Sequence, residues 1–117
     1  MTYKDLIVWQ KGIDLVDFIY DATKSFPRDE MYSLSDQMRR AAVSIPSNIA
    51  EGYRRNSNKE FVQFLGFSAG SAAELETQII IAGRRHFITD EQSKNLQNFT
   101  VEISKMLTTL IKKYKDT

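Results

Sequence analysis

The chain contains no cysteine, one histidine, two prolines and five glycines among its 117 residues. The lack of cysteine excludes disulfide frameworks, zinc ribbons and thiol catalysis, and it fits a reducing compartment. With a single histidine the chain cannot by itself supply the Glu-x-x-His pairs of a di-iron bundle. A phosphate-binding GxxxxGK[ST] loop is also missing, so we expect no metal and no cofactor.

Neither a net charge of one sign nor a long apolar run is present. Lys and Arg number 16 against 15 Asp and Glu, which gives a formal net charge of +1. No stretch approaches the roughly 18 consecutive apolar residues of a membrane span, and the N-terminal residues lack the apolar core of a signal peptide. We therefore expect one cytoplasmic domain over residues 1–117, with no membrane partner.

Apolar residues recur at helical spacing along most of the chain. This pattern predicts helices over about Leu6 to Ser25, Met31 to Arg54 and Asn58 to His86, and from Thr89 to about Tyr114. Because short connections between long helices favour antiparallel neighbours, the prediction is an all-α, antiparallel up-down-up-down four-helix bundle.

A proline and two capping pairs bear on where these helices bend and begin. Pro46 falls inside the second helix, but the apolar period continues across it, so we predict a kink there rather than a stop. Ser57 with Glu60, and Thr89 with Gln92, have the spacing of capping boxes, which predicts the starts of the third and fourth helices.

The first and third helices are apolar over a wider arc than one packed face requires. On the helical wheel, Ile7 and Phe18 fall outside the core arc of the first helix, and Phe67 and Ile81 outside that of the third. A monomeric bundle would leave several of these side chains in water, so we favour self-association. The alternative is a larger internal core with a few scattered exposed apolar residues, which are common on protein surfaces.

Polar residues line the apolar faces of the second and third helices. Glu76 projects into the apolar arc, where an unpaired carboxylate would be costly. An antiparallel hairpin of these helices would place Arg39 and Arg40 level with residues 71–76, which predicts a buried arginine–glutamate network. The alternative is a ligand or catalytic cleft lined by Arg40, Asn48, Glu51 and Glu74. The network residues are Arg40, Ser44, Asn48, Glu51, Ser71, Glu74 and Glu76.

One motif resembles a hydrolase signature. The letters GFSAG at Gly66–Gly70 match the G-x-S-x-G nucleophile elbow, with Ser68 in the nucleophile position. An elbow requires a strand, a sharp turn and a helix, whereas Ser68 falls in the middle of a predicted helix, about five turns from His86. We interpret the glycines as sites of close helix contact and expect no catalytic residues and no enzyme activity.

Basic residues occur in pairs and small groups. Ordinary solvated helix faces explain many such groups. In an oligomer, however, several copies of a weak basic patch could together hold a phosphate backbone that one copy would not. The candidate nucleic-acid contacts are Arg39, Arg54, Arg55, Lys59, Arg84 and Arg85.

Four segments together resemble a known family. They read LIVWQKGIDLVDFIY, FPRDE, SLSDQMRRAAVSIPSNIAEGYRR and GSAAELETQI. The chain resembles the bacterial four-helix-bundle proteins named after open reading frames in intervening sequences of 23S ribosomal RNA genes. It is also similar to the accessory variability proteins of diversity-generating retroelements, which pair with a reverse transcriptase and bind nucleic acid. The matching motif positions are Ser44, Asn48, Glu51, Gly52, Ser71 and Glu74.

The resemblance implies a ring-shaped homopentamer without known enzymatic activity. We carry two hypotheses of function from these observations. The first is a homo-oligomeric module that binds RNA or DNA, or a protein that handles RNA. The second is a protein-protein interaction scaffold with no nucleic-acid role, whose protein partner recognises exposed apolar residues such as Ile7 and Phe18.

Overall fold

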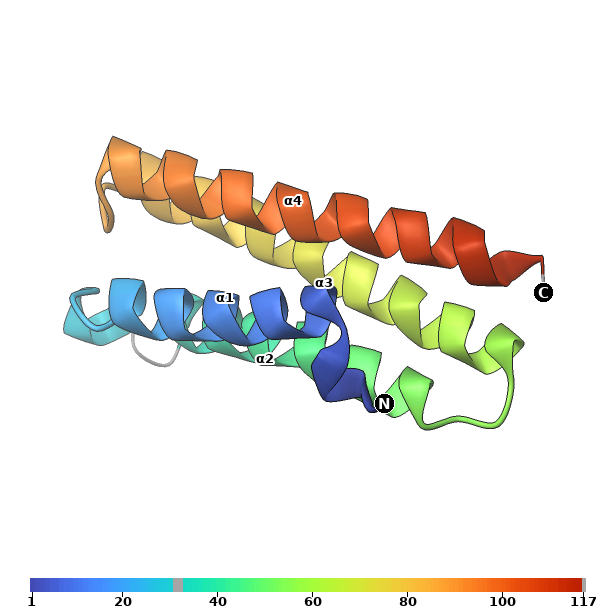
Figure 1. The fold of residues 1–117 in the computed structure, drawn as a ribbon. Helices are drawn as coiled ribbons and strands as arrows, with labels where there is room; N and C mark the ends of the chain where they lie inside the picture. Colours follow the sequence, from blue (N-terminus) through green and yellow to red (C-terminus); the bar gives the residue numbers. More distant parts are fainter. Residues whose placement is uncertain (31–32, 117) are drawn as a thin grey trace.

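The computed structural model describes residues 1–30 and 33–116, and every regular element in them is helical. Colours in Figure 1 run along successive long helices in alternating directions, as the antiparallel prediction requires. The predicted all-α four-helix fold is confirmed. The elements in chain order are η1 (Tyr3–Asp5), α1 (Ile7–Thr23), η2 (Arg28–Glu30), α2 (Leu34–Tyr53), α3 (Asn58–Arg84) and α4 (Asp90–Lys115).

Capping residues set the starts of the last two helices. The backbone N–H of Gln92 donates to Thr89 Oγ1 (3.0 Å), and the N–H of Thr89 donates to Gln92 Oε1 (2.8 Å), which completes the predicted capping box of α4. At α3 only half of the predicted box forms, since Ser57 Oγ accepts from the N–H of Glu60 (3.2 Å). The predicted start of the second helix at Met31 lies outside the described residues.

Helix α3 ends at Arg84, two residues before the predicted end at His86. His86 has a φ of 62°, in the left-handed region, which a continuing α-helix cannot contain. The chain folds back there, since the N–H of His86 donates to Gly83 O (3.1 Å) and that of Phe87 to Ala82 O (3.0 Å). These two bonds form a Schellman motif, a common helix end that usually places glycine at the left-handed position.

Helix α2 continues through Pro46, as predicted. Pro46 is buried against Gly12 of α1, where an added Cβ would lie 3.4 Å from the proline Cβ and Cδ. The glycine therefore lets the two helices approach closely at the one helical position that lacks a backbone N–H.

The core lies between all four helices, and each helix packs against its two neighbours. Ser44 Oγ and Ser71 Oγ lie 2.9 Å apart, and Ser68 Oγ donates to Ile45 O (2.9 Å), so the α2–α3 hairpin has nearly the expected register. The largest fully buried side chains include Leu15, Ile19, Met38, Ile45, Ile49, Leu65, Leu75, Ile79, Ile103 and Leu107.

Large apolar side chains remain on the surface, as the wide apolar arcs predicted. The exposed fractions are 61% for Ile7, 44% for Phe18, 49% for Phe67 and 42% for Ile81. None of these four side chains belongs to the buried core.

The molecule is elongated, with extents of 46 × 22 × 20 Å. Figure 1 shows the α2–α3 turn and the C-terminal end of α4 at one end of the bundle, and the α1–α2 and α3–α4 connections at the other. None of the helices in the described part of the chain is long and apolar enough to cross a membrane.

Candidate nucleic-acid interface

An aromatic contact brings two distant parts of the chain together at one end of the bundle. The ring of Phe61, at the start of α3, lies 5.2 Å from that of Tyr114 in the last turn of α4 and 5.9 Å from that of Tyr53 at the end of α2. The C-terminal lysines therefore lie beside the α2–α3 turn. The first residues of the chain join them, since Met1 to Lys4 line a hollow with Tyr53 and Arg54.

We call this region the basic end. Its basic side chains are exposed and outnumber the carboxylates Asp5, Glu51, Glu60 and Asp116. The basic residues are Lys4, Arg54, Arg55, Lys59, Lys112, Lys113 and Lys115. Lysines in the last turn of α4 also suit the negative end of that helix dipole.

Arg55 is held in place by its neighbours. Its guanidinium lies 3.6 Å from Glu51 and 3.8 Å from Glu60, and it stacks over the ring of Phe64 at 4.8 Å. All three side chains of these ion pairs are partly exposed, so the pairs orient Arg55 more than they stabilise the fold.

Arg54 and Lys59 have no carboxylate within 4.0 Å among residues 1–30 and 33–116. They flank the turn that precedes α3, on either side of the helix N-cap Ser57. Both cations are therefore available to an anion at this turn, whereas Arg55 is shared with two carboxylates.

A polar hollow of about 350 Å³ opens beside Arg55 at this turn. It is lined by Gly52, Tyr53, Arg55, Asn56, Ser57, Asn58, Phe61 and Tyr114. The N-terminal end of α3 faces the same turn, and the partial positive charge of a long helix favours anions there. Guanidinium, ammonium and a helix N-terminus are groups that hold phosphate oxygens.

The six predicted nucleic-acid contacts do not lie together in the structure. Arg54, Arg55 and Lys59 lie in the basic end, whereas Arg84 and Arg85 lie at the opposite end of α3. The remaining residue of the set, Arg39, belongs to the α1–α2 flank, where its Nε donates to Thr23 Oγ1 (2.8 Å) and its guanidinium stacks over Tyr20 (4.8 Å).

The predicted polar network also divides. Asn48 Nδ2 donates to Ser44 O and Ser44 Oγ, both at 2.9 Å, and Ser44 Oγ contacts Ser71 Oγ. Glu74 accepts from Gln78 Nε2 (3.3 Å), although Glu74 itself is exposed. Of these bonds only the one between Ser44 and Ser71 joins α2 to α3, whereas the others lie within a single helix.

The arginine–glutamate part of that network is not formed. Arg40 pairs with Asp36 on its own helix (3.0 Å), and Glu51 pairs with Arg55. Glu76 is half-buried and has no ion pair within the described part of the chain. It lies two turns before Gly83, whose missing Cβ would meet Ser93 of α4, so Glu76 faces the α4 flank and the arginines of α2 face elsewhere.

The serine of the GFSAG motif is part of the packing between α2 and α3. Ser68 is fully buried within α3 and donates to Ile45 O, so its hydroxyl is directed at the α2 backbone. Gly66 and Gly70 lie on the exposed side of the same helix, and nothing lies within 4 Å of a Cβ added at either position. The prediction that these glycines are sites of close helix contact is therefore wrong. The motif therefore lacks the strand and sharp turn of a nucleophile elbow.

The candidate contacts predicted from sequence did not include Lys4, Lys112, Lys113 or Lys115, which also belong to the basic end. The lysines of α4 fit the helix dipole, and that local explanation gave no sign that they would face Arg54 and Arg55. Tyr114 offered a weak signal, because an aromatic residue between two lysines in the last turn of an amphipathic helix is a candidate for packing at the bundle end.

The fold and this end define a class of protein: a small bundle of four antiparallel helices that presents cations at one end. Within that class the chain belongs to the 23S rRNA-intervening sequence protein family, whose model matches residues 4–109.

Comparison with solved structures agrees with this membership. A crystal structure described as a protein of unknown function from the S23 ribosomal protein family of Bacteroides thetaiotaomicron VPI-5482 is 28% identical, with a TM-score of 0.82. The similarity covers 91% of this chain and 99% of that one. Comparison with curated protein sequences gives no match.

Proposed function

We propose that the protein is a non-enzymatic, homo-oligomeric module, a pentamer as the family resemblance implies, that binds RNA or DNA through its basic end. The observation that supports binding is the presence of Arg54, Arg55, Lys59 and the C-terminal lysines at one end of the bundle, where Arg55 and Tyr114 line a polar hollow. Self-association is supported by the exposure of large apolar side chains such as Ile7 and Phe67.

One copy presents too few cations for tight binding to a phosphate backbone. Nucleic-acid affinity comes largely from counterion release, which grows with the number of phosphates neutralised. An oligomer that turns several basic ends to the same side multiplies those contacts without any new chemistry. The proposal therefore makes self-association a requirement of binding.

The test measures binding of a labelled single-stranded RNA by fluorescence anisotropy at several salt concentrations. The Arg54→Ala/Lys59→Ala variant is expected to bind at least about tenfold more weakly than the parent, with a shallower dependence on salt. Arg28→Ala/Lys105→Ala removes the same charge from exposed positions outside the basic end and is the matched control. Equal loss in both variants, or affinity that does not change with salt, would contradict the basic end as the site.

A protein partner is the second candidate function. Ile7 is 61% exposed and Phe18 is 44% exposed, and a scaffold or a protein that handles RNA could be recognised through such side chains. A partner retained from nuclease-treated lysate by the parent, and lost with Ile7→Ser/Phe18→Ser, would favour this function. A partner that disappears on nuclease treatment would instead indicate a nucleic-acid bridge.

A further inference from the structure

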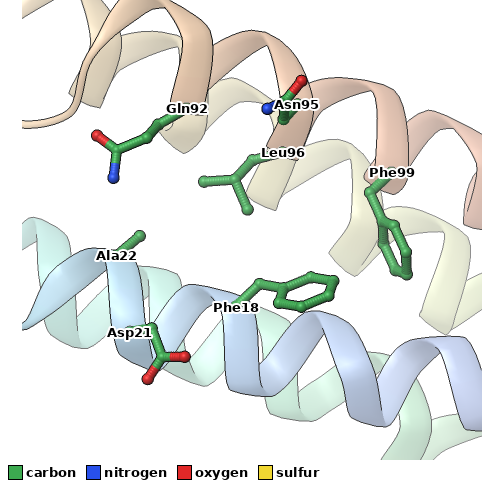
Figure 2. Close-up of a pocket in the computed structure, with 7 residues that line it drawn as sticks. All are labelled: Phe18, Asp21, Ala22, Gln92, Asn95, Leu96 and Phe99. Atoms are coloured by element: carbon green, nitrogen blue, oxygen red, sulfur yellow. The ribbon is translucent and has the colours of Figure 1, made fainter.

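An apolar groove lies between α1 and α4 at the end opposite the basic end. Its volume is about 390 Å³, and Figure 2 shows Phe18 from α1 and Leu96 and Phe99 from α4 turned toward the space between the two helices. The rings of Phe18 and Phe99 meet edge to face at 5.2 Å. The complete lining is Phe18, Asp21, Ala22, Gln92, Asn95, Leu96 and Phe99.

The groove is open because small and polar side chains occupy positions between α1 and α4 that large apolar side chains would fill in a tightly packed bundle. Ala22 faces the groove from α1, and Gln92 faces it from α4 (Figure 2). The aromatic walls of the groove remain in contact with water. Displacing that water with an apolar side chain lowers the free energy, because apolar surface is buried.

The rim of the groove is acidic. Asp14, Asp17 and Asp21 follow one another at spacings of three and four along the exposed side of α1. Lys24 lies 3.4 Å from Asp21, but both side chains are nearly three quarters exposed, so water screens this pair. Lys11 is engaged by Glu102 at 2.9 Å. An occupant that carries cations beside an apolar side chain would complement this rim.

The chain itself presents such a surface. Ile80 and Ile81 of α3 are 39% and 42% exposed, and each is followed one turn later by an exposed arginine, Arg84 and Arg85. We call these four residues the Ile80 ridge. Ile80 and Arg84 also border a shallow hollow with Lys94 and Asp90 of α4. Lys94 adds one positive charge to this surface, and Asp90 offsets one.

We propose that the groove of one copy receives the Ile80 ridge of a second copy. This inference rests on the self-association in the proposed function and names the two surfaces that make it. Contact between two grooves is disfavoured, because it would place the α1 aspartates of both copies against each other.

The positions of the two surfaces support this pairing. Gly83 of α3 lies against Ser93 of α4, and the two helices are antiparallel, so Ile80 is level with residue 96, whose side chain lines the groove. Groove and ridge therefore lie at the same height on neighbouring sides of the bundle, with α4 between them. A heterologous contact without displacement along the bundle axis closes into a ring when a whole number of rotations between neighbouring copies completes a full turn.

The test uses charge reversal and mass measurement by light scattering. Asp17→Lys/Asp21→Lys alters the groove, and Arg84→Glu/Arg85→Glu alters the ridge. Each variant alone is expected to dissociate at concentrations at least about tenfold above those at which the parent does. In an equimolar mixture every contact between unlike variants joins opposite charges, so the mixture is expected to gain mass over either variant alone. A five-membered ring of the two variants would keep at least one contact between like variants, so its mass is expected to approach that of the parent only at higher concentration.

Controls separate a folding defect from a lost contact. Helix content by circular dichroism should match the parent in both variants, and Arg28→Glu/Lys105→Glu should keep the parent's mass. A monomeric parent would overturn the self-association itself. A parent that gains mass only when another macromolecule is added is monomeric by itself and belongs to the same outcome. An oligomeric parent whose mass neither variant changes would overturn only the groove–ridge contact. Two monomeric variants that gain no mass when mixed would also overturn only that contact.

Discussion

His86 has the one positive φ among the non-glycine residues in the described ranges, at 62°. A side chain with a Cβ pays about 1–2 kcal/mol in this left-handed region, whereas glycine does not. Replacing His86 by glycine should therefore raise the free energy of unfolding by up to about 1 kcal/mol, after allowing for the extra freedom of glycine in the unfolded chain. Urea denaturation monitored by circular dichroism measures this change.

Arg85 gives the matched control for His86. Its φ of −82° is right-handed, so glycine there relieves no strain and should lower stability by about 0.5–1 kcal/mol. If both substitutions lower the free energy of unfolding, the contacts of the His86 side chain stabilise the fold by more than its left-handed backbone conformation costs.

The glycines differ in what surrounds them, and that difference predicts opposite effects of alanine. A Cβ on Gly52 would lie 2.5 Å from Phe64 Cβ, so Gly52→Ala should force α2 and α3 apart and cost about 1–3 kcal/mol. Nothing lies within 4 Å of a Cβ on Gly70, so Gly70→Ala should stabilise α3 by about 0.5–1 kcal/mol. Thermal unfolding of the two variants compares them directly, and equal shifts would contradict the close approach.

At the scale of the helix, the two N-terminal caps are unequal. Thr89 and Gln92 exchange two bonds that each involve a backbone N–H, whereas Ser57 and Glu60 share one such bond and a longer side-chain contact of 3.4 Å from Ser57 Oγ to Glu60 Oε1. Removing both bonds of the α4 box by Thr89→Ala/Gln92→Ala should therefore cost about 1–2 kcal/mol, whereas Ser57→Ala should cost about 0.5–1 kcal/mol. Chemical denaturation measures the free energy of unfolding of these variants. A larger loss for Ser57→Ala would contradict this order and show that Ser57 is the stronger cap.

Local pattern predicted the helices themselves and the Thr89 capping box, because these depend on residues three or four apart. It did not predict the end of α3, since the left-handed turn at His86 usually contains glycine. It also did not predict η1, whose capping box joins Thr2 to Asp5 ahead of α1. The arginine partner expected for Glu76 was wrong because the helical wheel gives a side chain's direction without the neighbour that it meets.

At the scale of the molecule, the basic end depends on contacts between residues far apart in sequence. Tyr114 reaches Phe61 across more than fifty positions, and that contact brings the lysines of α4 to Arg54 and Arg55. Sequence identified the three turn residues Arg54, Arg55 and Lys59, but it could not separate them from Arg84 and Arg85, which lie at the other end. The net charge of +1 does not indicate that basic side chains collect at one end of the bundle.

Coupling between assembly and binding gives a prediction for the whole molecule. The Asp17→Lys/Asp21→Lys variant gains positive charge, yet as a monomer it should bind a long RNA more weakly than the parent, by about a hundredfold or more, because avidity is lost. A short oligonucleotide that engages one copy should bind it at least as well as it binds the parent. Anisotropy with both probes measures this, and equal affinity for the long RNA would contradict the requirement for several copies.

The position of the chain ends has a practical consequence for labelling. Residue 1 lies beside Tyr53 and Arg54, and residue 116 follows the lysines of α4, so a polyhistidine tag or a fused fluorescent protein at either terminus would stand next to the candidate interface. Asp29, exposed in η2 at the opposite end, offers a distant alternative. Since the chain contains no cysteine, Asp29→Cys would supply a single thiol for a dye that leaves the basic end uncovered.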